Sequence, residues 1–263
     1  MARPAPSGAA PYAGAMTDVL PGAEPFSAAG GPNGALVLHG FTGSPQSMRP
    51  LAEAFAAAGF TTELPLLPGH GTSVEDMLQT SWADWSAAAD ATYRDLASRC
   101  DKVVVAGLSM GGTLTLWLAT RHPEIAGIVP INAAAMPMTD MVGLVQAMVD
   151  EGAEIMDAIG NDVADPDVTE LAYDKTPLRP LLSLAPVVEG LGEALKGVTC
   201  PALVIVSEQD HVVAPESSDH IVACLGGPSE KVVLTRSYHV ATIDFDKDLI
   251  TERAVDFGRR VTA

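Results

Sequence analysis

The sequence predicts an α/β fold in which a mostly parallel central sheet is flanked by helices. Short apolar runs rich in β-branched residues indicate buried parallel strands, and segments with helical periodicity separate them. Hydrophobic residues make up 48% of the 263 residues, which is enough for the core of one α/β domain. The expected strands are residues 35–38, 61–64, 103–106, 125–131, 202–206 and 231–234.

The expected helices carry start and stop signals. A helix over residues 50–58 ends before Gly59, because glycine commonly stops a helix. Ser81 and Asp84 resemble a capping box, with aspartate in place of the usual glutamate or glutamine, and open a long helix that reaches Arg99. Two further helices are expected over residues 113–120 and 217–224.

A serine lies at the sharp turn between the strand at 103–106 and the helix at 113–120. The turn, residues 107–111, has the pattern Gly-x-Ser-x-Gly with Ser109 at its centre. Glycines are needed because a Cβ two residues before or after the serine would collide with neighbouring backbone. Such a nucleophile elbow exposes the hydroxyl and leaves the backbone N–H of Met110 free to bind an oxyanion. The alternative is a glycine-rich turn with an incidental serine.

A serine nucleophile needs a histidine base and an acid that orients the base, in the order Ser, Asp/Glu, His along elbow proteins. Asp210 comes just after the strand at 202–206, and His239 comes just after the strand at 231–234. In open α/β sheets, ligands bind at the edge where the carboxyl ends of the parallel strands meet. The segment between the two residues can hold one helix and one strand, so we expect both side chains to converge near Ser109.

Two other acidic residues are rivals for the orienting acid. Glu208 precedes Asp210 by two residues, but Asp210 is favoured because it starts the loop rather than ending the strand. Asp244 follows His239 and is expected to be a helix cap or a surface charge on the approach to the last helix. Among the other histidines, we expect His39 and His70 to organise glycine-flanked loops, and His211 and His220 to lie at the surface or behind the site.

The second oxyanion donor should come from the loop after an early strand. The strand at 35–38 continues into such a loop, and the backbone N–H of Phe41 is the natural donor. Gly40 and Gly43 allow the backbone to curl toward the acyl oxygen. The alternative is an ordinary turn between a strand and a helix.

Together these motifs resemble the bacterial carboxylesterase/monoacylglycerol lipase group of the α/β-hydrolase superfamily. The matching segments are residues 39–45, 67–72, 107–112, 210–213 and 237–240. Residues 173–177 also resemble the point where the small cap of that group rejoins the core. The resemblance implies that Ser109 is the nucleophile, His239 the base and Asp210 the orienting acid, with the oxyanion hole at Phe41 and Met110. It also implies an α/β-hydrolase fold with a small inserted cap.

The chain divides into a tail, a split core and an insertion. Residues 1–16 are rich in alanine, proline and glycine, lack an apolar signal core, and are expected to form a flexible tail. Residues 17–132 and 179–263 form the core, and residues 133–178 form the cap. The cap is acidic and has no buried-strand run. Its methionines are Met136, Met138, Met141, Met148 and Met156. One interpretation is that they pack a helix. The other is that they line an adaptable lid over an acyl pocket.

Composition excludes several classes of function. A net charge of −18 disfavours nucleic acids and anionic membranes as partners. No apolar run approaches the roughly 20 residues that cross a bilayer, so no stable membrane insertion is expected. Three scattered cysteines indicate free thiols and a cytoplasmic protein. No motif for a metal, dinucleotide or phosphate is present, so no cofactor is expected; the oligomeric state is not predicted.

The sequence therefore predicts a serine carboxylesterase or monoacylglycerol lipase acting on a small-molecule ester of short to medium acyl chain. One alternative is hydrolysis of a C–C bond in a β-diketone, which uses the same three residues. Another is a receptor of hydrolase fold that binds a small molecule. The receptor is disfavoured because a binding protein needs no nucleophile.

Overall fold

The computed structural model describes residues 18–137, 139–158 and 160–263. Seven strands form its main sheet, in the order β1-β3-β2-β4-β5-β8-β9. All neighbours pair in parallel except β1, which pairs antiparallel with β3 at one edge. The strands are β1 (Phe26–Ala28), β2 (Asn33–Leu38), β3 (Thr61–Leu64), β4 (Lys102–Leu108), β5 (Gly127–Ile131), β8 (Ala202–Ser207) and β9 (Ser229–Leu234). The predicted mostly parallel sheet is confirmed. Strand β5 starts two residues later than expected, β2 and β9 start two residues earlier, and the edge strand β1 was not predicted.

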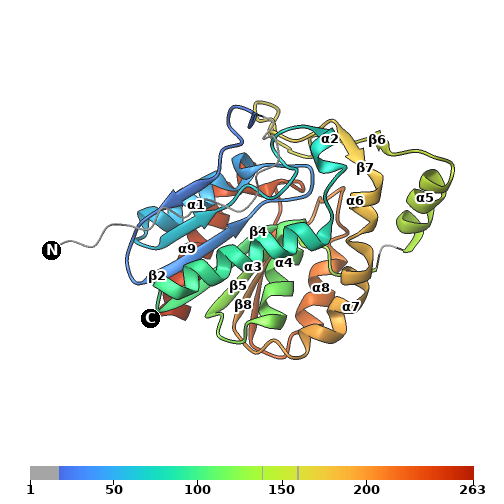
Figure 1. The fold of residues 1–263 in the computed structure, drawn as a ribbon. Helices are drawn as coiled ribbons and strands as arrows, with labels where there is room; N and C mark the ends of the chain where they lie inside the picture. Colours follow the sequence, from blue (N-terminus) through green and yellow to red (C-terminus); the bar gives the residue numbers. More distant parts are fainter. Residues whose placement is uncertain (1–17, 138, 159) are drawn as a thin grey trace.

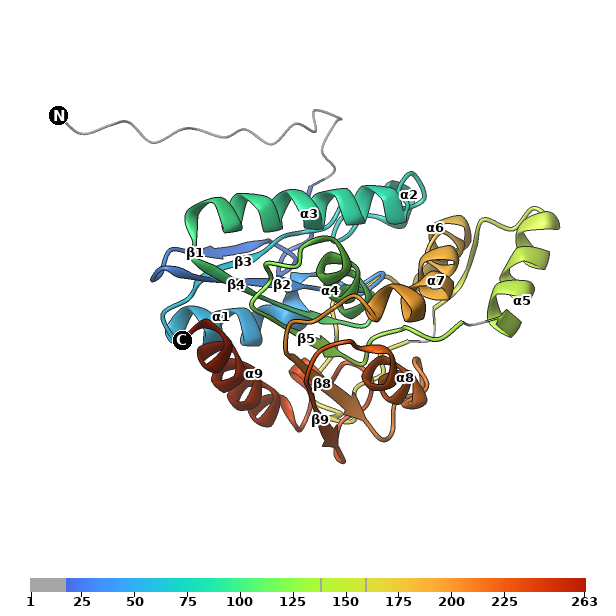
Figure 2. The ribbon, with the colours of Figure 1, turned by 90° about the horizontal axis from the view of Figure 1, so that it is seen from below.

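Helices cover both faces of this sheet, as the two views in Figures 1 and 2 show. The helices of the first face are α1 (Arg49–Ala57) and α9 (Lys247–Thr262). The helices of the second face are α3 (Trp82–Arg99), α4 (Met110–Arg121), α7 (Ala185–Leu195) and α8 (Glu216–Cys224). Strand β4 shows why both faces are apolar: Val103 and Val105 pack into the second layer, whereas Val104 and Ala106 pack into the first.

Local sequence signals fix the end of α1 and the start of α3 as predicted. Gly59 follows α1 with φ of +94°, a left-handed conformation that favours glycine. At the start of α3, the carboxylate of Asp84 accepts a hydrogen bond from the backbone N–H of Ser81 at 2.9 Å. The capping box therefore works with aspartate, whose side chain is shorter than that of the usual glutamate.

The insertion after β5 stands at one end of the molecule (Figure 1). Its elements are α5 (Thr139–Asp150), β6 (Ile155–Asp157) and β7 (Lys175–Pro177), and the two strands pair antiparallel in a small separate sheet. Two short helices lie next to it, α2 (Val74–Met77) and α6 (Leu178–Leu182). Two single-turn 3-10 helices, at Pro45–Met48 and Ala241–Ile243, complete the elements of the described residues.

Some sequence predictions fall outside the described residues. The tail at 1–16 lies outside them, as does Met138. All three cysteines are described, and none forms a disulfide. Within the described ranges, no helix is both long and apolar enough to cross a membrane.

Candidate active site

Ser109 occupies a strained turn between β4 and α4. Its φ of +56° and ψ of −119° place a non-glycine residue outside the regions that L-amino acids ordinarily adopt. Its N–H donates to the carbonyl of Ile131 at 2.9 Å, and its own carbonyl accepts from Thr113 at 3.0 Å. These bonds hold the serine at the carboxyl end of the sheet, at the first turn of a helix.

The two glycines of the turn are required by close backbone contacts. A Cβ on Gly107 would overlap the carbonyl of Gly111, and a Cβ on Gly111 would overlap the carbonyl of Leu38. Any other residue would force apart β2, β4 and α4. The predicted reason for the Gly-x-Ser-x-Gly spacing is therefore confirmed.

His239 and Asp210 meet across two loops at the same end of the sheet. Nδ1 of His239 lies 2.8 Å from Oδ2 of Asp210, and both side chains are buried, with 8% and 1% exposed. The other carboxylate oxygen of Asp210 accepts from the backbone N–H groups of Val212 and Val213, each at 2.8 Å. This arrangement orients the imidazole so that Nδ1 faces the acid and Nε2 stays available to accept a proton.

The structure separates the rival acids. Glu208 is exposed at the end of β8 and makes no such contact with the imidazole, so the preference for Asp210 agrees with the geometry. The expectation for Asp244 was wrong: this residue is fully buried and is neither a surface charge nor the N-cap of α9, which is Asp246. Its carboxylate accepts from the backbone N–H groups of Ala164, Asp165, Tyr238 and Phe245.

The loop after β2 lies beside Ser109. A Cβ on Gly40 would lie 3.5 Å from Cβ of Ser109, so this loop forms one wall of the site. The Phe41 ring packs edge-on against Trp85, with 5.6 Å between ring centroids. Thr42 has φ of +60°, and its hydroxyl donates to the carbonyl of Phe41 at 2.6 Å. Together these contacts fix the direction of the Phe41 backbone.

Two buried histidines, His39 and His70, support this loop. Both were predicted to organise glycine-flanked loops. Nδ1 of His39 donates to the carbonyl of Gly40 at 3.0 Å, and Nε2 accepts from the N–H of Leu67 at 3.1 Å. Only a neutral imidazole can do both. Burial lowers the pKa of His39 to about 4, and burial and the neighbouring His39 hold the pKa of His70 well below its ordinary value.

Glu170 reaches the site from the insertion. Its Oε1 lies over Gly43, since a Cβ on that glycine would approach it to 2.8 Å. Burial raises the pKa of the Glu170 carboxyl above its ordinary value, and the nearby His239 and Ser47 offset only part of this. A carboxyl group from the insertion therefore lies near both the loop after β2 and His239. Nothing in the sequence pointed to this residue beyond its place in the acidic insertion.

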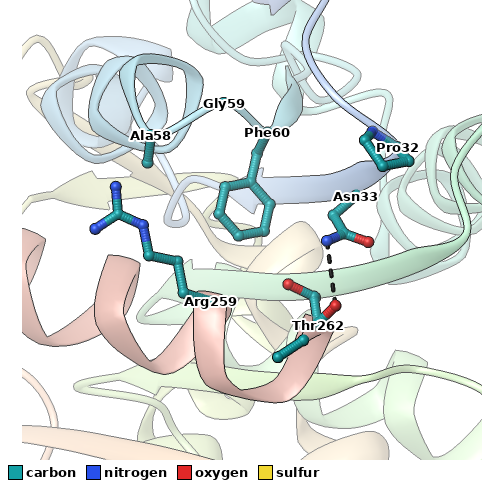
Figure 3. Close-up of a pocket in the computed structure, with 8 residues that line it drawn as sticks. Pro32, Asn33, Ala58, Gly59, Phe60, Arg259 and Thr262 are labelled. Carbon is teal, nitrogen blue, oxygen red and sulfur yellow. Dashed lines mark hydrogen bonds between the residues drawn. The ribbon is translucent and has the colours of Figure 1, made fainter.

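A separate small cavity of about 160 Å³ lies at the opposite end of the sheet (Figure 3). Its lining includes Asn33, Phe60 and Arg259, and the side-chain amide of Asn33 donates to the carbonyl of Thr262 at 3.2 Å. None of the predicted site residues lines it. The chemistry expected from the sequence therefore belongs to the carboxyl end of the strands and not to this cavity.

The chain has clear relatives among known proteins. Residues 35–251 match the model of the alpha/beta hydrolase family. The chain belongs to this family. Over 242 residues it is 50% identical to the thermostable monoacylglycerol lipase of Bacillus sp. strain H-257, covering 91% of this chain and 95% of the relative. It is also 27% identical to a carboxylesterase of Bacillus subtilis strain 168, covering 89% and 95%.

Among solved structures, this α/β hydrolase is similar to a structure reported in work on two metagenome-derived lipolytic enzymes, LipS and LipT. The two have 45% sequence identity and a TM-score of 0.89, covering 92% of this chain and 100% of the other. The predicted fold class and family are confirmed. The runner-up functions, C–C bond hydrolysis and small-molecule reception, gain no support from these relatives.

A supporting residue that the sequence did not indicate is Asn132, which follows β5 with φ of +45°. Its amide nitrogen donates to the carbonyl of His239 at 2.7 Å and to Oγ of Ser207 at 3.1 Å, and its oxygen accepts from the N–H of Ser207 at 2.8 Å. Asn132 thus ties the loop that carries His239 to the ends of β5 and β8. The available signal was a polar residue directly after a buried strand.

We expect acid to destabilise the fold through His39. Below pH 6.5 the unfolded His39 binds a proton while the folded one, with a pKa of about 4, does not. Unfolding is therefore favoured as pH falls, and His39 alone costs about 2 kcal/mol between pH 7 and pH 5. Urea unfolding of wild type and His39→Asn at both pH values tests this. The variant should lose about 2 kcal/mol less on acidification; equal losses would contradict a neutral, buried His39.

Proposed function

We propose that this serine ester hydrolase acts through an acyl-enzyme on Ser109, with His239 as general base and Asp210 as the acid that orients it. The observation that carries the proposal is a strained serine at the end of β4 together with a buried imidazole held by a carboxylate. Strain of about 1–3 kcal/mol persists only where surrounding structure imposes it, and it concentrates at functional sites.

The hydrogen bond to Asp210 sets the direction of proton transfer. With Nδ1–H donated to the carboxylate, Nε2 of His239 accepts the proton of the Ser109 hydroxyl as Oγ attacks the ester carbonyl. The negative carboxylate stabilises the imidazolium that forms. The imidazolium then gives its proton to the departing alcohol, and water repeats the sequence on the acyl-enzyme.

The proposed oxyanion hole is formed by the backbone N–H groups of Phe41 and Met110. Met110 is the first residue of α4, where N–H groups have no acceptor within the helix. The loop that carries Phe41 passes beside Ser109 at Gly40, and the packing of its ring on Trp85 holds the backbone in place. Donors fixed before the reaction stabilise the developing charge without reorganisation.

We propose a monoacylglycerol of short to medium acyl chain as substrate. The relative with 50% identity is a monoacylglycerol lipase, and Glu170 supplies a polar group suited to the alcohol hydroxyls. Its carboxyl lies over Gly43 and close to His239, where the departing alcohol is protonated. A carboxyl accepts hydrogen bonds from hydroxyl groups, whereas a simple aryl ester offers it none.

A panel of monoacylglycerols and p-nitrophenyl esters of matched chain length tests this substrate. We expect Glu170→Ala to lower kcat/KM for monoacylglycerols about tenfold, because the hydrogen bond between the carboxyl and the alcohol hydroxyl is lost. Activity on p-nitrophenyl esters should stay within about threefold of wild type. An equal loss on both substrates would assign Glu170 to the histidine rather than to the alcohol.

We further propose that residues 133–178 form a cap over the acyl pocket. Supporting this, Tyr173 near the end of the insertion donates to the carbonyl of Gly69 at 2.9 Å, and its N–H donates to the carbonyl of Thr42 at 3.1 Å. The described methionines of the insertion are Met136, which is exposed, and Met141, Met148 and Met156, which pack around Val145, Val149 and Leu178. These three thus belong to the small core of the insertion.

The same panel tests the cap. Met148→Trp overpacks the core of the insertion, so it should shift the preferred acyl length while activity on the shortest ester changes little. Thermal unfolding of the variant provides the control for a general loss of folding. An unchanged chain-length profile in a folded variant would separate the insertion from the acyl pocket.

A further inference from the structure

Asp162 lies in the insertion and contacts both loops that carry the acid and the base. Its Oδ2 accepts from the N–H of His239 at 3.0 Å and from the N–H of His211 at 3.2 Å. Its Oδ1 lies 2.8 Å from Nδ1 of His211, and its carbonyl accepts from the N–H of Val240 at 3.1 Å. A single residue therefore gathers four hydrogen bonds from two loops that are distant in sequence.

The partners of Asp162 are sequence neighbours of the reacting side chains. His211 directly follows Asp210, and Asp162 also bonds the backbone N–H of His239 itself. The carboxylate is largely buried, with 12% of its side chain exposed, whereas the His211 side chain is 57% exposed. The His211 ring packs edge-on against Tyr238, which precedes His239, with 4.6 Å between centroids. These contacts thus fix the backbone of the two loops that carry the side chains of Asp210 and His239.

The segment that carries Asp162 is anchored a second time. Asp244, which is fully buried, accepts from the N–H groups of Ala164 and Asp165 and also from that of Tyr238. The two anchors hold the segment after β6 to the histidine loop. As a result, Asp162 cannot easily move away from the loops that it contacts.

We propose that Asp162 is a positioning residue that keeps Asp210 and His239 aligned with each other for proton transfer. It does not touch the ester, and it acts through the backbone of the two loops. Removing its acceptors frees these loops to shift, and a displacement of about 1 Å between reacting groups costs roughly 10²-fold in rate. This inference rests on the roles proposed for Ser109, Asp210 and His239.

The test compares Asp162→Ala, Asp162→Asn and the control Asp165→Ala in steady-state hydrolysis of one p-nitrophenyl ester. Asp162→Ala should lower kcat by roughly 10²-fold with KM changed less than about threefold, because alignment and not binding is lost. Asp162→Asn keeps an oxygen that accepts both backbone N–H groups, so it should restore most of kcat. Among the described residues, the side chain of Asp165 bonds only the backbone N–H of Asp167, and its removal should leave kcat unchanged.

Labelling of Ser109 by a fluorophosphonate provides a second readout that needs no ester. We expect the labelling rate of Asp162→Ala to fall in parallel with kcat, since both need the aligned base. If Asp162→Ala does not fold, Asp162→Ser takes its place. The serine side chain is too short to reach both backbone N–H groups, so we expect kcat to fall at least about tenfold.

Three results would overturn the proposal: kcat within threefold of wild type in the folded alanine or serine variant, a rise in KM alone, or an asparagine variant as defective as alanine. If wild-type protein were not labelled at Ser109, the proposed function itself would fail. Labelling of wild type with no effect at Asp162 would instead reject this inference only.

Discussion

Replacing Ser109 with alanine is expected to reduce kcat for ester hydrolysis by about 10⁶-fold, the loss seen when the nucleophile of a comparable triad is removed. In the proposed mechanism the oxygen of this hydroxyl forms the acyl-enzyme, and its neighbours cannot substitute for it at the tip of a turn fixed by Gly107 and Gly111. The measurement is steady-state hydrolysis of p-nitrophenyl butyrate, together with mass-spectrometric mapping of the fluorophosphonate adduct.

The control for this variant is its folding, followed by circular dichroism and thermal unfolding. Alanine keeps the Cβ and the backbone bonds to Ile131 and Thr113, so the fold should persist. The adduct should appear on Ser109 in wild type and be absent from the variant. Robust hydrolysis by folded Ser109→Ala would remove the basis of the proposed mechanism.

Asp210→Asn is expected to lower kcat by about 10⁴-fold, because an amide in this position favours the wrong tautomer of His239 for the proposed proton transfer. The carboxylate bonds Nδ1 of His239 at 2.8 Å and is itself held by the N–H groups of Val212 and Val213. An asparagine retains an oxygen for those N–H groups, so the loop should keep its shape. The measurement is kcat at fixed pH with saturating ester.

Glu208→Gln is the matched control, since it makes the same chemical change two residues earlier. Glu208 is exposed and its backbone N–H bonds the carbonyl of Leu234, so its side chain should contribute little to kcat. If Glu208→Gln were the more defective variant, the orienting acid would have to be reassigned to Glu208.

The parts of the site that depend on contacts between residues close in sequence could be predicted from the sequence. The elbow around Ser109 follows from a buried strand, two glycines and a helix start, all within about ten residues, and these features leave few alternative conformations. Asp210 and His239 were identified by their positions after strands, because parallel strands bring their carboxyl ends to one edge. The sheet and both helical layers follow from the same pattern.

The residues that the sequence did not indicate act over long separations. Asp162 and His239 are 77 residues apart, and Asn132 and His239 are 107 residues apart. Asp244 was misjudged because an aspartate before a helix usually caps it or faces water. Its burial depends on backbone N–H groups of the insertion, about 80 residues earlier, that no periodicity or spacing reveals.

The anchoring of the insertion has a consequence for how ester enters the site. The part from Asp162 to Tyr173 is fastened to the histidine loop at one end and to the loop of Thr42 at the other. The part formed by α5 packs against α6 in a small separate cluster, and Leu144 on its surface is 64% exposed. If the insertion covers the acyl pocket as proposed, the part from Asp162 to Tyr173 is its fixed half. We then expect an opening that admits an acyl chain to occur on the α5 side.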